Sequence, residues 1–277
     1  MVCLTGDIHH ASLKTKGQKY LPLKKTEAVL ACRYLEIAEA YKIKVTLFMT
    51  GRLFLEEWDS IRELLKYNNL EIGGHSFNAF QSKLLHLGVF KFLMGSVWGP
   101  RFYQKREIIK TIQIIKERIG FSILSWRNHA FIHDNNTYEI LRECGIRIIS
   151  DEIKRDIFFP YMVHDSLISL PINTLIDHNH VFHAFRSPSY VAKEKWMGDD
   201  FGNQSYNIEK WGTLVQNQIQ AIVERKGIAT ILAHPICMYL SDKFKIFEAL
   251  CKFISSFHTI FAKDVLKLNL SKTPNTS

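Results

Sequence analysis

Cysteine is scarce in this sequence, and its pattern argues against a disulfide-stapled fold. The 277 residues contain five cysteines, an odd number, with no CxxC pair, and several of them stand inside apolar runs. This pattern is typical of reduced core cysteines in an intracellular protein. No apolar run is long enough to cross a bilayer and no signal peptide precedes the first apolar run, so we expect a cytoplasmic protein.

Blocks of charge and phosphate-binding glycine loops are missing as well. The formal net charge is +9, but lysine and arginine are scattered along amphipathic segments, so we interpret the charge as a solvated surface and expect no nucleic-acid partner. The sequence has no GxGxxG or GxxxxGK loop, no internal repeat and no linker-like change of composition. With 47% hydrophobic residues, we expect one domain over residues 1–268 and a polar, disordered tail over 269–277.

What the sequence does contain is an alternation of two periodicities. Short runs rich in β-branched and aromatic residues predict strands over residues 1–8, 44–49, 70–75, 121–126, 146–149, 228–233 and 259–262. Apolar residues spaced three and four apart predict helices over residues 25–41, 58–67, 103–119, 136–144, 210–226 and 243–253. Strands that alternate with helices are parallel, which leaves an α/β barrel or an open doubly wound sheet.

Two segments fit neither periodicity. Residues 81–99 are apolar but irregular, which is compatible with a helix packed over the barrel rim or with a flap on the substrate side. Residues 154–209 are interrupted by three prolines, and long irregular segments in compact domains are commonly functional loops. We therefore expect substrate contacts from the second segment.

Ionisable side chains stand at the carboxyl ends of the predicted strands. They are Asp7, His9, His75, Arg127, Asp151 and His234. Asp7 and His9 share one face of the first strand, because alternate side chains of a strand point the same way. Barrel enzymes build their sites from the ends of several strands, whereas an open sheet gathers its ligand at one switch point. We therefore predict an α/β barrel with about seven parallel strands.

The order and spacing of these strand ends resemble those of the polysaccharide deacetylases of the NodB-homology type, carbohydrate esterase family 4, along nearly the whole chain. Residues 5–9, TGDIH, are similar to the TFDxD form of the family's first motif. The resemblance implies a distorted (β/α) barrel in which Asp7 is the catalytic base. It also implies that His9 takes the place of a metal-binding aspartate.

Three later segments carry the same resemblance. Residues 71–76, EIGGHS, are similar to the family's EIGxHS segment, which implies that His75 is a metal ligand. Residues 126–129, WRNH, resemble the RxP motif, which implies that Arg127 orients the catalytic aspartate. Residues 232–235, LAHP, resemble the motif of the general acid, which implies that role for His234.

Two departures from the family pattern concern the metal. The second motif normally reads HxxxH, but Ala79 stands four residues after His75, and His129 replaces the proline of RxP. A catalytic zinc site takes three protein ligands and one open position, so a third ligand has to come from elsewhere. The candidates are His10, Asn78, His129, Asp177, His178 and His180. We place Trp126 and Asp151 on the pocket wall, with a helix cap or surface turn as the alternative for Asp151.

The chemistry that this set implies is hydrolysis of an N-acetyl amide on a sugar. A divalent metal, expected to be Zn²⁺, at His9 and His75 would polarise the carbonyl and acidify a water molecule. Asp7, kept ionised by Arg127, would take a proton from that water, and His234 would protonate the departing amine. The substrate would be an N-acetylated saccharide in surface polysaccharide or glycoconjugate assembly, either a sugar nucleotide or a lipid-linked saccharide.

Two other functions stay open at this point. The same fold could hydrolyse a non-sugar amide, such as a ring amide or an N-formyl group. The absence of a histidine at position 79 is also compatible with a metal-free carbohydrate-binding protein that has lost its activity.

Overall fold

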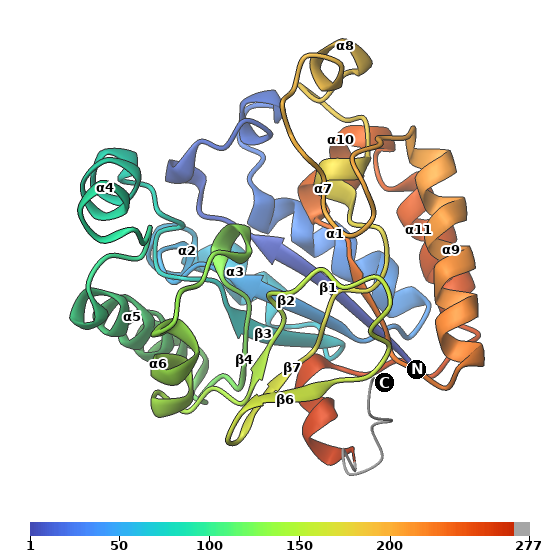
Figure 1. The fold of residues 1–277 in the computed structure, drawn as a ribbon. Coiled ribbons are helices and arrows are strands. Elements are labelled where there is room, and N and C mark those ends of the chain that lie inside the picture. Colours follow the sequence, from blue (N-terminus) through green and yellow to red (C-terminus); the bar gives the residue numbers. More distant parts are fainter. Residues whose placement is uncertain (269–277) are drawn as a thin grey trace.

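A curved sheet of eight strands runs through the centre of the molecule (Figure 1). The computed structural model describes residues 1–268, so the disorder predicted for 269–277 lies outside the described residues. The strands are β1 (Val2–Ile8), β2 (Val45–Met49), β3 (Leu70–Gly74), β4 (Ser125–Trp126), β5 (Ile148–Ile149), β6 (Tyr161–His164), β7 (Leu167–Ser169) and β8 (Ala229–Leu232). Within residues 1–268, no helix is both long and apolar enough to span a membrane.

The strands lie in the order β6-β7-β5-β4-β3-β2-β1-β8, and every neighbouring pair is parallel except β6 and β7. Seven parallel strands thus form a curled half-barrel, which confirms the predicted fold class. The eighth strand, β6, adds an antiparallel edge, and neither β6 nor its parallel-sheet neighbour β7 was predicted from the sequence pattern.

Helices lie around the sheet and beyond the ends of its strands (Figure 1). They are α1 (Glu27–Ala40), α2 (Leu53–Glu56), α3 (Trp58–Leu64), α4 (Lys91–Met94), α5 (Arg101–Ile119), α6 (Thr137–Glu143), α7 (Asp177–His180), α8 (Pro188–Val191), α9 (Ile208–Glu224), α10 (Pro235–Asp242) and α11 (Lys245–Ile254). Helices such as α1, α5 and α9 pack around the sheet, whereas α7 and α8 lie beyond the ends of its strands (Figure 1). α1 begins where the Thr26 hydroxyl accepts a hydrogen bond from the Val29 amide, and α5 ends at Gly120, whose φ is 85°.

Gly74, the last residue of β3, allows β4 to approach β3 closely. A Cβ atom at Gly74 would overlap the indole of Trp126 on β4, so only glycine lets this fully buried ring pack flat against β3. The close approach sets His75, next after Gly74, beside Arg127, next after Trp126.

Asn173 links the two open edges of the half-barrel beside the start of β8. Its side-chain oxygen accepts from the Thr230 amide at 2.9 Å, and its amide nitrogen donates to the Ile228 carbonyl at 2.9 Å, both beside β8. The preceding residue, Ile172, bonds the Glu152 carbonyl beyond β5 at 2.8 Å. The chain after β7 therefore crosses to β8, and α7 lies at the carboxyl ends of β1 and β8, where Asp177 bonds His234.

Three sequence expectations need revision. Residues 259–262 form no strand: Thr259 pairs with β1 only at Val2, because β2 takes over that side of β1 from Leu4 onward. Within residues 81–99, Leu84–Phe90 form a π-helix that is followed by α4, but most large apolar side chains of this segment are exposed rather than packed over the sheet. Residues 154–209 are less irregular than predicted, since they contain β6, β7, α7 and α8.

Candidate active site

Asp7 is the last residue but one of β1, and its side chain is held by a fully buried arginine. Its Oδ1 accepts a hydrogen bond from Arg127 Nη1 at 2.9 Å. The guanidinium is itself fixed, because Nη2 donates to Thr5 Oγ1 at 3.0 Å and to Ser150 Oγ at 2.8 Å, and Nε donates to the Ser150 carbonyl at 2.8 Å. A charge-assisted contact of this kind fixes both the charge and the orientation of the carboxylate.

The surroundings of Asp7 favour its ionised form. Burial alone would raise the pKa of Asp7, but the Arg127 guanidinium, followed by His75 and His234, outweighs burial and holds that pKa well below its usual value. Asp7 is therefore a carboxylate at neutral pH, with its second oxygen free of Arg127.

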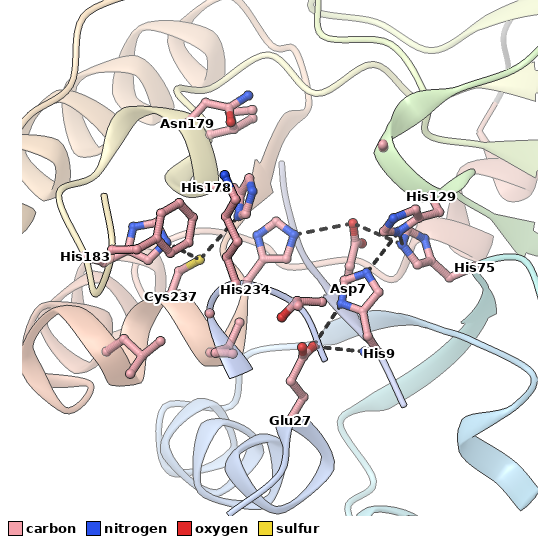
Figure 2. Close-up of a pocket in the computed structure, with 18 of the residues that line it drawn as sticks. Asp7, His9, Glu27, His75, His129, His178, Asn179, His183, His234 and Cys237 are labelled. Atoms are coloured by element: carbon pink, nitrogen blue, oxygen red, sulfur yellow. Dashed lines mark hydrogen bonds and ion pairs between the residues drawn. The ribbon is translucent and has the colours of Figure 1, made fainter. Parts of the chain in front are cut away.

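Three imidazoles from three strand ends meet on one side of Asp7 (Figure 2). His9 Nε2 lies 3.1 Å from His129 Nδ1, which lies 3.3 Å from His75 Nε2. The three ring nitrogens lie within 4.8 Å of one another, and His75 Nε2 is 3.9 Å from Asp7 Oδ2. We call His9, His75 and His129 the three-histidine cluster.

The outer nitrogens of His9 and His75 are held by hydrogen-bond acceptors. His9 Nδ1 lies 3.0 Å from Glu27 Oε2, and His75 Nδ1 lies 2.8 Å from the Arg127 carbonyl. Because both partners are acceptors, each Nδ1 donates its hydrogen outward and each Nε2 turns inward, toward His129. The single hydrogen that the neutral His129 ring carries can be shared with at most one of these two Nε2 atoms.

Hydrogen bonds among the three rings therefore cannot use all the inward-facing nitrogens, whereas a bound cation could. Burial lowers the pKa of His75 to about 3, and burial with His9 and His75 lowers the pKa of His129 well below its usual value, so both rings are neutral. Converging imidazole nitrogens held from outside by a carboxylate and a backbone carbonyl are the donor set of a zinc-type site.

His234, the N-cap residue of α10, faces Asp7 from the opposite side (Figure 2). Its Nε2 is 3.5 Å from Asp7 Oδ2, its Nδ1 is 2.6 Å from Asp177 Oδ1, and its backbone amide donates to Asp177 Oδ2 at 2.5 Å. Burial would lower the pKa of His234, but Asp177 and then Asp7 outweigh it and raise that pKa to about 10. The ring is therefore charged at neutral pH and can give up a proton.

These groups open into a cavity of about 420 Å³. This volume lies in the range of small-ligand pockets. Its walls also contain Lys16, Lys83, Phe131, His178, Phe185 and Leu240. The wall therefore combines apolar and ionisable groups around Asp7.

Comparison with known proteins gives a match at the level of fold. No protein-family model matches this sequence, and no curated protein matches it. Among solved structures, a "putative polysaccharide deacetylase" from Mycobacterium smegmatis superposes with a TM-score of 0.69 at 17% identity, over 100% of this chain and 94% of that one. The chain has the fold of the NodB-type deacetylases.

Other solved structures with this fold are described as enzymes with different activities. The Puue allantoinase matches with a TM-score of 0.65 at 12% identity, over 96% of this chain and 88% of that chain. A family 4 acetyl xylan esterase from Clostridium thermocellum, in complex with a cobalt ion, matches with a TM-score of 0.54 at 14% identity, over 96% and 90% of the two chains. At these sequence identities the similarity shows the NodB-type fold. The activity has to be inferred from the residues of the site.

The departure from the NodB-type second motif has a structural counterpart in this chain. Ala79, at the place of the motif's second histidine, is buried and has a left-handed backbone with φ of 50°. His129, one of the third-ligand candidates, is the ring that joins His9 and His75. The loop after β4 thus supplies the third imidazole.

The stretch 177–180, another predicted ligand source, is split between different environments. Both oxygens of Asp177 are engaged by His234, so its position indicates a partner of His234 rather than a metal ligand. His178 lines the cavity on the His234 side. His180 lies away from the cavity, where its ring bonds the Gln204 carbonyl at 2.6 Å and Asp199 at 3.1 Å.

Four further candidates also lie outside the cavity lining. His10 turns its Nδ1 to Thr50 Oγ1 at 3.1 Å, because it points to the opposite side of the chain from His9. Asn78 is half-buried in the loop after β3. Trp126 is a fully buried core side chain, and Asp151 accepts hydrogen bonds at 2.6 Å from the amide and side chain of Asn128, so both support the Arg127 loop from behind.

Sequence reasoning missed Glu27, the residue that fixes His9. Glu27 lies in the first turn of α1 with 1% of its surface exposed and binds both the backbone amide and the ring of His9. An acidic residue in the first turn of a helix is ordinary, since it complements the helix dipole, so the sequence carried no distinguishing signal.

Proposed function

We propose that this protein is a metal-dependent hydrolase that removes an N-acetyl group from a saccharide. The observation that supports this function best is the position of Asp7, which lies between the three-histidine cluster and the charged imidazole of His234. An ionised base and a protonated acid, with pKa values shifted in opposite directions, are the pair that amide hydrolysis needs at neutral pH.

The three-histidine cluster would hold the cation, for which Zn²⁺ is the expected choice. A divalent cation supplies Lewis-acid polarisation of the acetyl carbonyl and makes a water molecule more acidic. Asp7 accepts the proton of the attacking water at its Oδ2, while Arg127 keeps Oδ1 in place. His234 gives its Nε2 proton to the departing amine, and Asp177 holds the ring in the orientation that points Nε2 at Asp7.

Two features support an activated precursor, in particular a lipid-linked saccharide, as substrate. The five cysteines are free, as in proteins of reducing compartments. Residues 84–94, which follow the cavity residue Lys83, expose large apolar side chains: Leu84 is 83%, Phe92 86% and Leu93 71% exposed. Lys83 precedes this stretch, Lys91 lies within it, and no acidic residue occurs in 81–100, a composition that suits an anionic lipid surface.

The test is acetate release from defined substrates by metal-loaded protein. We expect release from an N-acetylated lipid-linked saccharide presented in anionic vesicles, slower release from an N-acetylated sugar nucleotide, and none after chelation. His129→Ala should lose both bound metal and at least about 10²-fold in rate, because it removes one ligand of the site. His258→Ala, which alters an exposed histidine far from the cavity, is the matched control.

Two outcomes would overturn the proposal. Turnover only of ring amides or N-formyl compounds would favour a hydrolase of non-sugar amides. Tight saccharide binding without acetate release, by protein that takes up no zinc, cobalt or manganese, would favour a carbohydrate-binding protein.

A further inference from the structure

A second group of potential ligands lies in the same cavity, on the His234 side of Asp7 (Figure 2). Cys237 Sγ is 3.5 Å from His183 Nε2 and 3.9 Å from His178 Nδ1. The three atoms lie within 4.8 Å of one another, and all three residues line the cavity. We call His178, His183 and Cys237 the thiol cluster.

The surroundings of His183 turn one lone pair toward the thiol. His183 Nδ1 lies 2.8 Å from the Val181 carbonyl, an acceptor, so the ring hydrogen is on Nδ1 and Nε2 is bare. The thiol has one hydrogen, which His183 Nε2 can accept, and His178 Nδ1 approaches the same sulfur. A buried cysteine paired with one histidine would be ordinary packing, whereas two imidazoles that converge on one sulfur form a donor set suited to a soft cation.

The deacetylation mechanism uses none of these three side chains. Asp7 acts with Arg127, His234 is held by Asp177, and the three-histidine cluster lies on the far side of Asp7. The thiol cluster is nevertheless close to the reacting groups, because the ligand atoms of Cys237, Asp177 and His234 also lie within 4.8 Å of one another.

We propose that the thiol cluster is a second cation site, which binds a soft divalent ion such as Zn²⁺ through one thiolate and two imidazoles. Sulfur and imidazole ligands select zinc and its heavier congener cadmium over magnesium or calcium. On binding, the S–H bond of Cys237 breaks, the proton passes to solvent and the sulfur lone pair forms the bond to the ion. The fourth position of the ion faces the cavity.

Occupation of the thiol cluster has a consequence for catalysis, and this consequence alone rests on the proposed function. The ion would fill the part of the cavity beside His234, where the departing amine has to receive its proton. One equivalent of zinc therefore activates through the three-histidine cluster, and excess zinc inhibits competitively through the thiol cluster.

The decisive experiment is titration of the metal-free full-length protein with Cd²⁺, followed by the ultraviolet thiolate-to-cadmium charge-transfer band. We expect two equivalents to bind, with the band appearing with the second. Cys237→Ser should bind one equivalent and give no band, and His183→Gln, which keeps the thiol, should weaken binding of the second equivalent at least about tenfold. Cys32→Ser, which removes a half-buried thiol outside the cavity, should behave as wild type.

The two proposals fail in different ways. His129→Ala should lose the first equivalent and keep the band, whatever the enzymatic activity. A band that persists in Cys237→Ser, or wild-type protein that binds cadmium without any band, would overturn the thiol cluster as a site. If the band depends on Cys237 but excess zinc inhibits wild type and Cys237→Ser equally, the site stands and its inhibitory role falls.

Discussion

The two ligand clusters on either side of Asp7 differ in how firmly the fold holds them. The three-histidine cluster takes its rings from the ends of β1, β3 and β4, and Glu27 and the Arg127 carbonyl fix two of them from outside. The thiol cluster takes both rings from one short stretch, residues 178–183, and its only fixed ring is His183.

This difference predicts which of the two clusters binds its cation more tightly. Rings fixed by buried partners lose little freedom when a cation binds, so the three-histidine cluster should bind tightly. His178 is exposed and has to be ordered on binding, so the thiol cluster should fill only at higher concentrations of the ion. Four substitutions test the roles of the residues in and around the two clusters.

Asp7→Asn should have the largest effect, because Asp7 lies between the three-histidine cluster and His234. We expect acetate release to fall about 10³-fold, since the base is lost, while the three-histidine cluster still binds its cation. Arg127 would lose its buried counter-charge, so the protein should also unfold at a lower temperature. Initial rates with metal content counted in the same sample test this, and a rate within about tenfold of wild type would exclude Asp7 as the base.

Asp177→Asn should lower the rate about 10²-fold and change its pH dependence. His234 works as an acid only while protonated, so activity falls as the pH rises through its pKa of about 10. Without the Asp177 charge that pKa falls, and the alkaline limb of the rate profile should move to lower pH.

The same pair contributes to stability with a definite sign. Because the folded-state pKa of His234 is raised from 6.5 to about 10, the stabilisation is complete below the unfolded-state value and disappears as the pH rises through the folded one. Denaturant unfolding at several pH values should show a smaller loss in Asp177→Asn than in wild type, because only Asp7 then raises the pKa of His234. An unchanged rate profile in the variant would show that Asp177 does not act through His234.

Glu27→Gln tests whether outer partners make the three-histidine cluster the firmer site. The glutamine can still bond His9 but carries no charge, and we expect metal affinity to fall about 10-fold to 100-fold. Cadmium binding at the thiol cluster should not change. Glu36→Gln, on the exposed face of the same helix, is the matched control, and equal affinities in the two variants would contradict the role of Glu27.

His10→Gln should have the smallest effect on catalysis, because this histidine belongs to neither cluster. Burial lowers the pKa of His10 to about 4, so the unfolded chain binds a proton that the folded chain rejects, and stability drops as the pH falls from 6.5 toward 4. The variant should keep its rate and metal content and lose part of this acid sensitivity, by less than about 3 kcal/mol. Urea unfolding at neutral and acidic pH measures the effect, and a metal-depleted variant would place His10 in the site after all.

The architecture could be predicted from the sequence because strands and helices are marked by patterns of neighbouring residues. Each strand of the parallel core is a short apolar run, and the carboxyl ends of parallel strands meet at one edge of a sheet, so Asp7, His75, Arg127 and His234 could be expected together. The exception is instructive: residues 259–262 have strand composition, but β2 occupies the edge of β1 that they would need.

By itself, the sequence therefore determined a parallel α/β fold and the strand ends at which its chemistry lies, since periodicity and strand direction are properties of neighbouring residues. Only the tertiary structure decided that His129 completes the three-histidine cluster, that Glu27 fixes His9 and that Asp177 holds His234. These contacts span 18 to 120 residues of sequence. They depend on the path of the loops and on the buried Gly74 and Asn173, and a pattern of adjacent residues does not encode such a path.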